Sequence, residues 1–407
     1  MKKILIVVSI LFVIFLALVY FFKINVTSKL KSYLTNEQKQ IIKKYLFPYK
    51  LIDQLEYELT QNSKLIDKLE YELNSSLYKE LEFKKKKSDI RIIKDIKLQN
   101  GKTLKIFNLT GGFYSGIHEK FNRSGYIDFH KDNLFILSSH GTLAFSKNIF
   151  NETYFKQVSN NINDFIGIKQ FQKHIWFSLK DLLIEDDKIF ISFTEEIKDN
   201  CWNTSLIYGD INYEKIIFKK LFTSEDCIDS RKEINNEFNA HQSGGRIVKY
   251  DKDHVLLTVG DYRRRFLAQD KNSINGKIIK INTENFQYEI ISMGHRNPQG
   301  LYFDKEKNII LETEHGPMGG DEINLIQVSK INDEKIQNYG WPVVSAGEHY
   351  GGKVKKNDDK YKKYPLYKSH SKHGFIEPLK TFVPSIAISE IVKIAENKYA
   401  FGSMGKD

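Results

Sequence analysis

The most constraining feature of this chain is a long series of short aromatic and β-branched segments that begins after residue 96. Examples are KIFISFTE at 188–195, GRIVKYDKDHVLLTVGD at 245–261, KIIKINTENFQYEIISM at 277–293 and LYFDKEKNIILETEHG at 301–316. Turns rich in Asp, Asn, Lys or Gly separate them, and nothing of helical length and period intervenes. The pattern predicts an all-β fold of hairpins. Over some three hundred residues this means a sandwich, a barrel or a propeller, and a propeller accommodates the length most naturally.

A continuous apolar segment lies near the start of the chain, from Ile4 to Phe22, and its 19 residues carry no charge. A helix of this length just spans a hydrocarbon core, so the segment is a membrane helix or a signal peptide. It exceeds the roughly 7–15 residues of a signal-peptide core, and bulky aromatic residues stand where small ones precede a cleavage site. We therefore expect residues 1–23 to be an uncleaved anchor. The basic residues before it favour a cytoplasmic N-terminus, which places the body on the periplasmic, extracytoplasmic side.

Residues 24–96 contain an internal repeat, because LIDQLEYELTQNSK at 51–64 is followed directly by LIDKLEYELN. The period of 14 residues is two heptads, with apolar residues on the a and d positions, which indicates a short coiled-coil stalk. The same pattern suits a single amphipathic helix packed against the body, because fewer than four heptads specify a coiled coil weakly. A coiled coil would also make the protein a homo-oligomer.

The net charge of +11 invites a nucleic-acid partner, but its distribution argues against one. Residues 23–96 carry 16 basic and 11 acidic side chains, whereas residues 97–407 carry 44 basic and 40 acidic ones. The body therefore lacks the electrostatic footprint of a protein that binds a polyanion. The basic excess lies beside the predicted membrane segment, where it can meet anionic headgroups or simply be solvated.

Three stretches of the body carry polar groups that a plain β-scaffold does not need. They are NAHQSGGR at 239–246, GHRNPQG at 294–300, and EHGPMGGDEIN at 314–324, which leads to NYGWP at 338–342. The imidazole of His241 is suited to take a proton near neutral pH, although a hydrogen-bonded loop histidine is the simpler interpretation. Arg296 offers a planar fork for carboxylate or quinone oxygens, and Asn297 adds a donor and an acceptor. The third stretch supplies the hard oxygen ligands that calcium uses, without the spacing of an EF-hand.

The order HQSGGR, GD, NGKI, GHRNPQGL, EHGPMGGDEIN and NYGWP over residues 239–342 strongly resembles the glucose/sorbosone dehydrogenase family. The resemblance implies a six-bladed β-propeller that holds pyrroloquinoline quinone over a bound calcium ion. It also implies an enzyme that oxidises the CH–OH group of an aldose sugar and passes electrons to a respiratory acceptor. The anchor and the stalk have no counterpart in the resemblance.

The resemblance assigns roles to individual residues of this chain. His241 is similar to the general base that takes the proton of the sugar's anomeric hydroxyl while a hydride passes to the quinone. Arg296, Asn297 and, as the weakest match, Lys406 correspond to residues that bind the cofactor. The remaining matches are calcium ligands: the carbonyls of Gly316 and Pro317 at the cofactor's ion, and Glu322 with the carbonyl of Tyr339 at a structural ion.

Three positions depart from the family pattern and support a second hypothesis. Ala240 stands where the glucose enzyme has an acidic residue, Phe266 where it has an amide, and Gly405 where the cofactor lysine belongs. They are compatible with a non-catalytic, calcium-stabilised propeller that serves as a binding module displayed on the stalk. A purely structural envelope protein would explain the coiled coil but not the retained His241, Arg296 and Asn297.

The sequence stops at residue 407, before the family's last blade, and its two cysteines leave one covalent question open. We expect residues 97–407 to be a C-terminally incomplete propeller from a longer reading frame, rather than a true five-bladed variant. Cys201 and Cys227 lie in a turn-rich stretch before His241, and either bridge to one another in an oxidising compartment or remain two free buried thiols.

Overall fold

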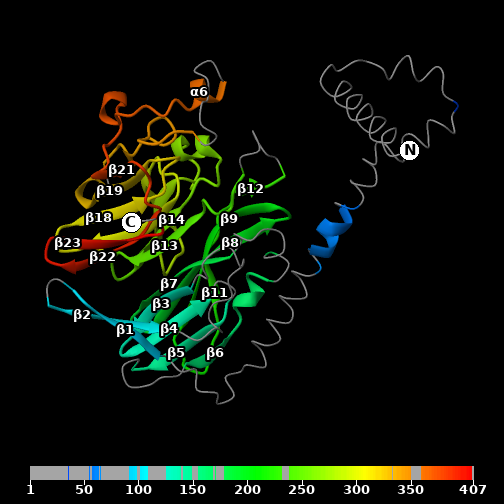
Figure 1. Ribbon diagram of the computed structural model, residues 1–407, viewed down its shortest axis with the longest axis vertical. Helices are drawn as coiled ribbons and strands as arrows, with labels where there is room; N and C mark the ends of the chain where they lie inside the picture. Colours follow the sequence, from blue (N-terminus) through cyan, green and yellow to red (C-terminus); the bar gives the residue numbers. More distant parts are fainter. Residues whose placement is uncertain are drawn as a thin grey trace, which may run out of the picture. The chain divides into compact units, whose positions relative to one another are not determined.

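Antiparallel strands form nearly all of the regular structure in the body of the protein (Figure 1). The computed structural model describes residues 91–98, 101–108, 125–138, 141–148, 155–167, 170, 178–231, 238–331, 333–349 and 359–405, with 35, 55, 57–63 and 65 near the start. Residues 57–63 of the predicted stalk are helical. The predicted anchor at 1–23 lies outside the described residues, and within those residues no helix is long and apolar enough to cross a bilayer. The anchor and the coiled coil stay predictions.

Most strands form antiparallel meanders of consecutive segments, and strands from later in the chain are added in parallel at the edge of two of the sheets. A hairpin of β1 (Arg91–Lys97) and β2 (Thr103–Asn108) comes first. The first large sheet contains β3 (Gly125–His130), β4 (Asn133–Ser138), β5 (Leu143–Lys147), β6 (Lys156–Asn160) and the parallel β10 (Lys215–Ile216). The second contains β7 (Leu179–Glu185), β8 (Lys188–Lys198), β9 (Cys201–Asp210), β11 (Lys219–Phe222) and β12 (Ile228–Asp229).

The later sheets repeat this plan. The third contains β13 (Gly244–Lys249), β14 (His254–Val259), β15 (Lys277–Asn282), β16 (Tyr288–Met293) and β20 (Gln337–Asn338). The fourth contains β17 (Pro298–Asp304), β18 (Ile309–Glu314), β19 (Asp321–Gln327) and β21 (Lys380–Phe382), and β22 (Ile388–Ala395) pairs with β23 (Lys398–Ser403). Short helical turns are η2 (Ile162–Asp164), η3 (Arg265–Gln269), η4 (Val328–Lys330), α6 (Asp359–Lys363) and η5 (Ser371–His373).

The first strands of successive sheets pack next to one another, in the order β3, β7, β13, β17, β22. Figure 1 labels β3, β7, β13 and β22 of this series. The second strand of a sheet is therefore covered on both faces, and β14 is apolar and buried without alternation. Val255 and Leu257 pack towards the preceding sheet, while Leu256 packs towards the following one. This propeller-like, all-β arrangement confirms the predicted fold class, and the count of six blades stays a prediction.

A hydroxyl group on the second strand of a sheet repeatedly bonds to the first strand of the next sheet. Ser192 of β8 donates to the carbonyl of Gly245 on β13. Thr258 of β14 donates to the carbonyl of Pro298 on β17 (3.0 Å), and Thr313 of β18 donates to that of Ser389 on β22 (2.5 Å). Each bond satisfies a buried carbonyl at the start of an inner strand, so neighbouring sheets are held in register at the same end.

Arg246 of β13 connects four of the inner strands. Its guanidinium contacts the carboxylates of Asp181 on β7 (2.5 Å) and Glu390 on β22 (2.6 Å), and donates to the carbonyl of Gln299 on β17 (3.1 Å). Asp181 also accepts the backbone N–H of Ile247 (2.7 Å). This network fixes the geometry of the strands because the buried carboxylate of Asp181 and the partly exposed one of Glu390 both pair with the same cation.

The two cysteines form a disulfide between Cys201, at the start of β9, and Cys227, immediately before β12. This outcome settles the open question in favour of the bridge. The neighbouring Trp202 and Ile228 face each other across β9 and β12 and pack with Ala240 and Tyr262 in one buried cluster. The disulfide therefore stabilises the wall against which the segment before His241 packs.

We expect the double variant Cys201→Ser, Cys227→Ser to lower the free energy of unfolding by roughly 3 kcal/mol, because the bridge closes a loop of 26 residues. Denaturant unfolding, followed by tryptophan fluorescence, measures the change. A reducing agent should shift the transition of the natural protein by a similar amount and leave the variant unaffected. Equal stability of the two proteins under oxidising conditions would contradict the assignment.

Candidate active site

The three predicted polar stretches all lie at the same end of the inner strands. Residues 239–243 precede β13, residues 294–297 precede β17, and residues 315–320 join β18 to β19. In an up-and-down meander, the loop that enters the first strand and the loop that joins the second to the third fall at one edge of the sheet. Stretches about 75 residues apart in the sequence therefore meet in space.

His241 is a half-buried histidine whose environment favours the neutral imidazole. Burial lowers the pKa of His241 to about 3, helped by the positive charges of Arg263, Arg296 and Lys180. Its backbone N–H donates to Oδ1 of Asn239 (3.1 Å), which fixes the turn that carries it. A neutral imidazole has a nitrogen lone pair available at physiological pH, which is what a general base requires.

Gln242 links the base to the charged groups around it. In the amide orientation that satisfies both of its ends, Gln242 donates to Oδ1 of Asp261 (3.0 Å) and accepts from Arg296 Nη2 (2.6 Å) and Arg263 Nε (3.0 Å). Asp261 also accepts from the indole N–H of Trp341 (2.8 Å). Asp261 is part of the GD motif, and Gln242 is part of HQSGGR, but the sequence alone gave no reason to assign either residue a role.

Arg296 and Asn297 are held by backbone groups of neighbouring loops. Arg296 donates through Nη1 to the carbonyl of His315 (2.8 Å), and its guanidinium lies over the ring of Trp341 at 5.4 Å. Asn297 accepts the N–H of Gly244 through Oδ1 (3.2 Å). The structure thus places the charge of Arg296 near His241 and bonds Asn297 to Gly244, three residues after the histidine. The roles assigned to these three residues stay predictions.

Arg263 adds a second guanidinium beside the base and lies on a strained segment. Tyr262 and Arg263 both adopt left-handed backbone angles, with φ of 48° and 62°. Such angles are uncommon outside glycine and persist where the surroundings impose them. Here the N–H of Arg263 donates to Oδ1 of Asp261 (2.8 Å), and the Tyr262 hydroxyl pairs with Thr204 (2.9 Å).

The predicted carbonyl ligands Gly316 and Pro317 lie in a tight turn between β18 and β19. The N–H of Gly316 donates to Oδ1 of Asp321 (3.2 Å), and the carbonyl of Pro317 accepts from Gly320 (3.1 Å). A Cβ atom on Gly316 would lie 1.6 Å from the carbonyl oxygen of Gly320. Asp321 also accepts the N–H of Ile388 through Oδ2 (3.2 Å), so the turn is fixed against β22.

The remaining predicted ligands occupy other surroundings. Glu322 is buried on β19 and faces Nε2 of His370 at 3.5 Å, and burial raises the pKa of its carboxyl. Tyr339 donates its N–H to the carbonyl of Met293 (2.9 Å) and its hydroxyl to that of Leu325 (2.6 Å). The calcium predicted at these two residues stays a prediction. Lys406 lies outside the described residues.

The three departures from the family pattern are also placed. Ala240 is fully buried in the apolar cluster that contains Trp202, so nothing at this position reaches a ligand with a polar group. Phe266 is 40% exposed at the start of η3. A Cβ atom on Gly405 would approach the carbonyl oxygen of Ile386 to 2.6 Å, so a side chain at this position requires a shift of the backbone.

Comparison with known proteins identifies the family. The sequence model of the glucose/sorbosone dehydrogenase family matches residues 179–403, and the chain belongs to this family. The aldose sugar dehydrogenase YliI of Escherichia coli K12 is 28% identical over 207 residues, covering 46% of this chain and 52% of the relative. Quinoprotein glucose dehydrogenase B of Acinetobacter calcoaceticus is 31% identical over 136 residues, covering 26% of this chain and 27% of the relative. The chain thus spans about half or less of the length of these curated relatives.

Among solved structures, the soluble aldose sugar dehydrogenase of Escherichia coli in its apo-form is similar to this chain with a TM-score of 0.50 and 24% identity. The similarity covers 66% of this chain and 74% of that one. At this level of identity the comparison supports the fold.

We expect Gly316→Ala to destabilise the protein by more than about 2 kcal/mol, because the added Cβ overlaps the backbone of Gly320. Gly319→Ala is the matched control in the same turn. Its Cβ would find only Val383 at 3.9 Å, so the cost is the roughly 1 kcal/mol of its left-handed backbone, with φ of 85°. Thermal unfolding of both variants gives the comparison, and a larger loss for Gly319→Ala would refute this description of the turn.

In the protein without quinone, we expect the imidazole of His241 to remain neutral down to about pH 3 to 4. Arg263→Gln should raise the pKa of His241, because it removes the strongest charge acting on the imidazole, whereas Lys280→Gln should leave it unchanged. NMR titration of the histidine side chains measures this, with His241→Gln for assignment. A pKa of His241 near 6.5 in the natural protein would contradict this description of its buried, positively charged surroundings.

Proposed function

We propose that this protein is a membrane-anchored, pyrroloquinoline quinone-dependent dehydrogenase that oxidises an aldose sugar or a related substrate. The observation that carries the proposal is the neutral His241 placed beside Arg296, with Gln242 bonded to that guanidinium. A base and a cation at one site suit a reaction in which a proton and a hydride leave the same substrate. Membership of the glucose/sorbosone dehydrogenase family supports the same conclusion.

The residues around His241 fit the quinone. Pyrroloquinoline quinone carries carboxylates and carbonyl oxygens, and Arg263 and Arg296 place two guanidinium groups at one end of the inner strands. Burial is the main cause of the lowered pKa of His241, and the positive charges of Arg263 and Arg296 lower it further; the same charges would attract an anionic cofactor. When bound, the quinone would accept the hydride of the substrate carbon, which carries the two electrons of the oxidation.

The chain's own contribution is to position the substrate and to take up a proton. A ring nitrogen of His241 accepts the proton of the sugar's anomeric hydroxyl as the C–H bond breaks and the C–O bond becomes a double bond. The substrate is thereby oxidised to a lactone. Arg296 is kept in place by the carbonyl of His315 and by Trp341, so its charge does not need to reorganise during the reaction.

Calcium completes the proposal. The carbonyls of Gly316 and Pro317 would hold the ion that supports the quinone, and backbone carbonyls are the hard oxygen donors that calcium prefers. The turn that presents them is already fixed by Asp321 and lacks room for a side chain at Gly316. Calcium at Glu322 and Tyr339 remains the second part of this proposal.

The apolar segment from Ile4 to Phe22 supports an anchor with the N-terminus in the cytoplasm and the propeller on the periplasmic side. The Cys201–Cys227 disulfide is consistent with an oxidising compartment. A respiratory electron acceptor would then reoxidise the quinone at the membrane, and the predicted stalk would hold the body above it.

A non-catalytic binding module is the second candidate, favoured by the position before the base. Ala240 is buried among apolar side chains, so it offers no polar group to a sugar. If catalysis has been lost, the same propeller would bind a partner through the loops at this end. Turnover measurements separate the two candidates.

We expect His241→Gln to lower the turnover of aldoses by at least roughly 100-fold, because the general base is removed, while quinone binding in the presence of calcium is retained. His254→Gln is the control, since this half-buried histidine pairs with Asp251 and has no role in the site. Quinone absorbance measures binding, and its bleaching by a panel of aldoses measures turnover. A natural protein that binds quinone without bleaching, or takes up none, would favour the binding module.

A further inference from the structure

A second cluster of ionisable side chains lies behind the active site, on one face of the β18–β19 hairpin. Glu312 and Glu314 alternate along β18 and therefore point to the same side. Asn324 of β19 is paired with Glu312, and His295 comes from the loop before β17. His295, Glu312 and Asn324 are completely buried, and Glu314 is 3% exposed.

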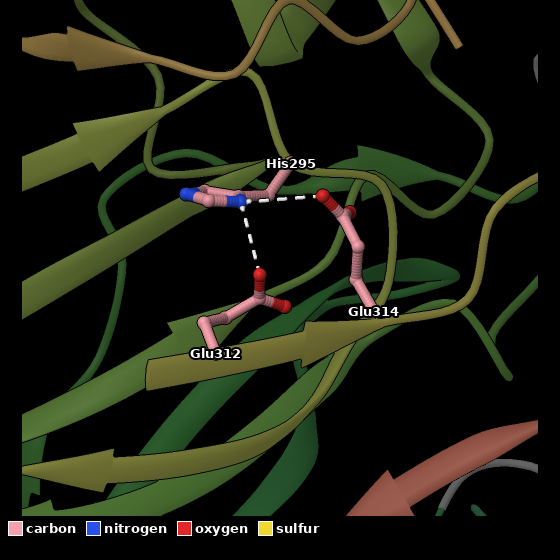
Figure 2. Close-up of side chains that lie close together, drawn as sticks. All are labelled: His295, Glu312 and Glu314. Atoms are coloured by element: carbon pink, nitrogen blue, oxygen red, sulfur yellow. Dashed lines mark ion pairs between the residues drawn. The ribbon is translucent and has the colours of Figure 1, made fainter. Parts of the chain in front are cut away.

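The donor atoms of this cluster converge on one point. Figure 2 shows both carboxylates directed at the same ring nitrogen of His295. Nδ1 of His295 lies 3.7 Å from Oε2 of Glu312 and 3.5 Å from Oε1 of Glu314, and the three ligand atoms all lie within 4.8 Å of one another. Ligands at about 2.1 Å from a tetrahedral ion are about 3.4 Å apart, so the spacing suits a small cation between them.

The groups around the cluster hold each donor in the orientation that a metal ligand requires. Nε2 of His295 pairs with the Ser292 hydroxyl (2.8 Å), which directs Nδ1 towards the carboxylates, and the ring stacks on Tyr339 at 5.0 Å. The Nδ2 group of Asn324 donates to both Glu312 and Glu314, each at 3.0 Å. A histidine oriented by its second nitrogen, and carboxylates that are themselves hydrogen-bonded, are typical of a metal site's outer shell.

Several buried atoms of the cluster lack a hydrogen-bond partner within the described part of the chain. They are Nδ1 of His295, Oε1 of Glu312 and Oδ1 of Asn324. In the tautomer with the proton on Nε2, the lone pair of Nδ1 faces two carboxylate oxygens, which is repulsive, and buried carboxylates without a counter-charge are costly. Glu322, on the same hairpin face, has its own neighbour in His370 at 3.5 Å. A divalent cation would neutralise Glu312 and Glu314 and satisfy the imidazole nitrogen.

We propose that His295, Glu312 and Glu314 form a structural site for a divalent transition-metal ion such as Zn²⁺ or Mn²⁺. The imidazole nitrogen among the ligands favours these ions over calcium, which takes oxygen ligands. Its ligands differ from the residues expected to bind calcium, although Glu322 is the cross-strand partner of Glu314 and the ring of Tyr339 stacks on His295. The second oxygen of Glu314 accepts the backbone N–H of Arg296 (2.5 Å), so the ion would fix the loop that presents this arginine.

The test uses the full chain without quinone, so that failure of the proposed dehydrogenase activity cannot influence it. Because the site is buried, the protein is first unfolded and its metal ions are removed with a chelator. After the chelator is removed, the protein is refolded in millimolar calcium with ZnCl₂, with MnCl₂ or with no transition metal. We expect about one Zn²⁺ or Mn²⁺ per chain by elemental analysis after dialysis, and a higher melting temperature than with calcium alone.

Glu312→Gln removes one charged ligand but keeps the size of the side chain and the bond to Asn324. We expect it to weaken the binding of Zn²⁺ or Mn²⁺ by roughly 10-fold to 100-fold. Asp304→Asn is the matched control, because it alters a buried carboxylate on β17 of the same sheet that belongs to neither the proposed site nor the predicted calcium sites. It should leave transition-metal binding intact. Circular dichroism establishes that both variants fold.

Three results would overturn the proposal. The first is a natural protein that retains no transition metal in excess calcium. The second is retention that Glu312→Gln does not change. The third is a Glu312→Gln variant that is more stable than the natural protein under every metal condition, which would show that a proton, and not a metal ion, balances the two carboxylates.

Discussion

The buried guanidinium of Arg246 stands where the inner strands of four sheets meet, and the described architecture depends on that contact. Asp181, Glu390 and the carbonyl of Gln299 all rely on this single cation. Removing it would leave the buried carboxylate of Asp181 without its counter-charge, and breaking a buried ion pair in this way typically costs about 3–5 kcal/mol, whereas Glu390 is partly exposed to solvent. Backbone hydrogen bonds join the strands within a sheet. Strands of separate sheets have no such bonds between them in the described part of the chain, so side-chain contacts of this kind fix their relative positions.

The contacts between the inner strands also fix the geometry of the candidate active site. Gly245 and Arg246 donate their N–H groups to Thr258, whose hydroxyl donates in turn to Pro298, so the starts of β13 and β17 are bonded through one side chain. His241 and Asn297 lie just before these two strands. The relative position of His241 and Asn297 is therefore set by the strands, and it depends little on the conformation of the loops.

Local patterns in the sequence predicted the strand-rich body and singled out His241, Arg296 and Asn297 as candidate site residues. Alternating apolar residues and turn residues indicate strands, and each of the three site residues stands within a short sequence motif. The roles of Gln242 and Asp261 could not be predicted, since they arise from an amide and a carboxylate that meet only after the sheets pack. The same holds for His295 with Glu312, because the motif GHRNPQG drew attention to its arginine. Ala240 seemed a lost ligand, and the structure adds that it fills an apolar cluster beside Trp202.

The hydroxyl bonds from Ser192, Thr258 and Thr313 have a consequence for how such a protein can arise. The second, third and fourth sheets each carry, on their second strand, the group that attaches them to the next sheet. A duplicated segment of the gene would therefore bring its own connection, and no complementary surface would have to evolve separately. Ancestral proteins built this way could gain or lose sheets in single genetic events while the joint between neighbours stayed the same.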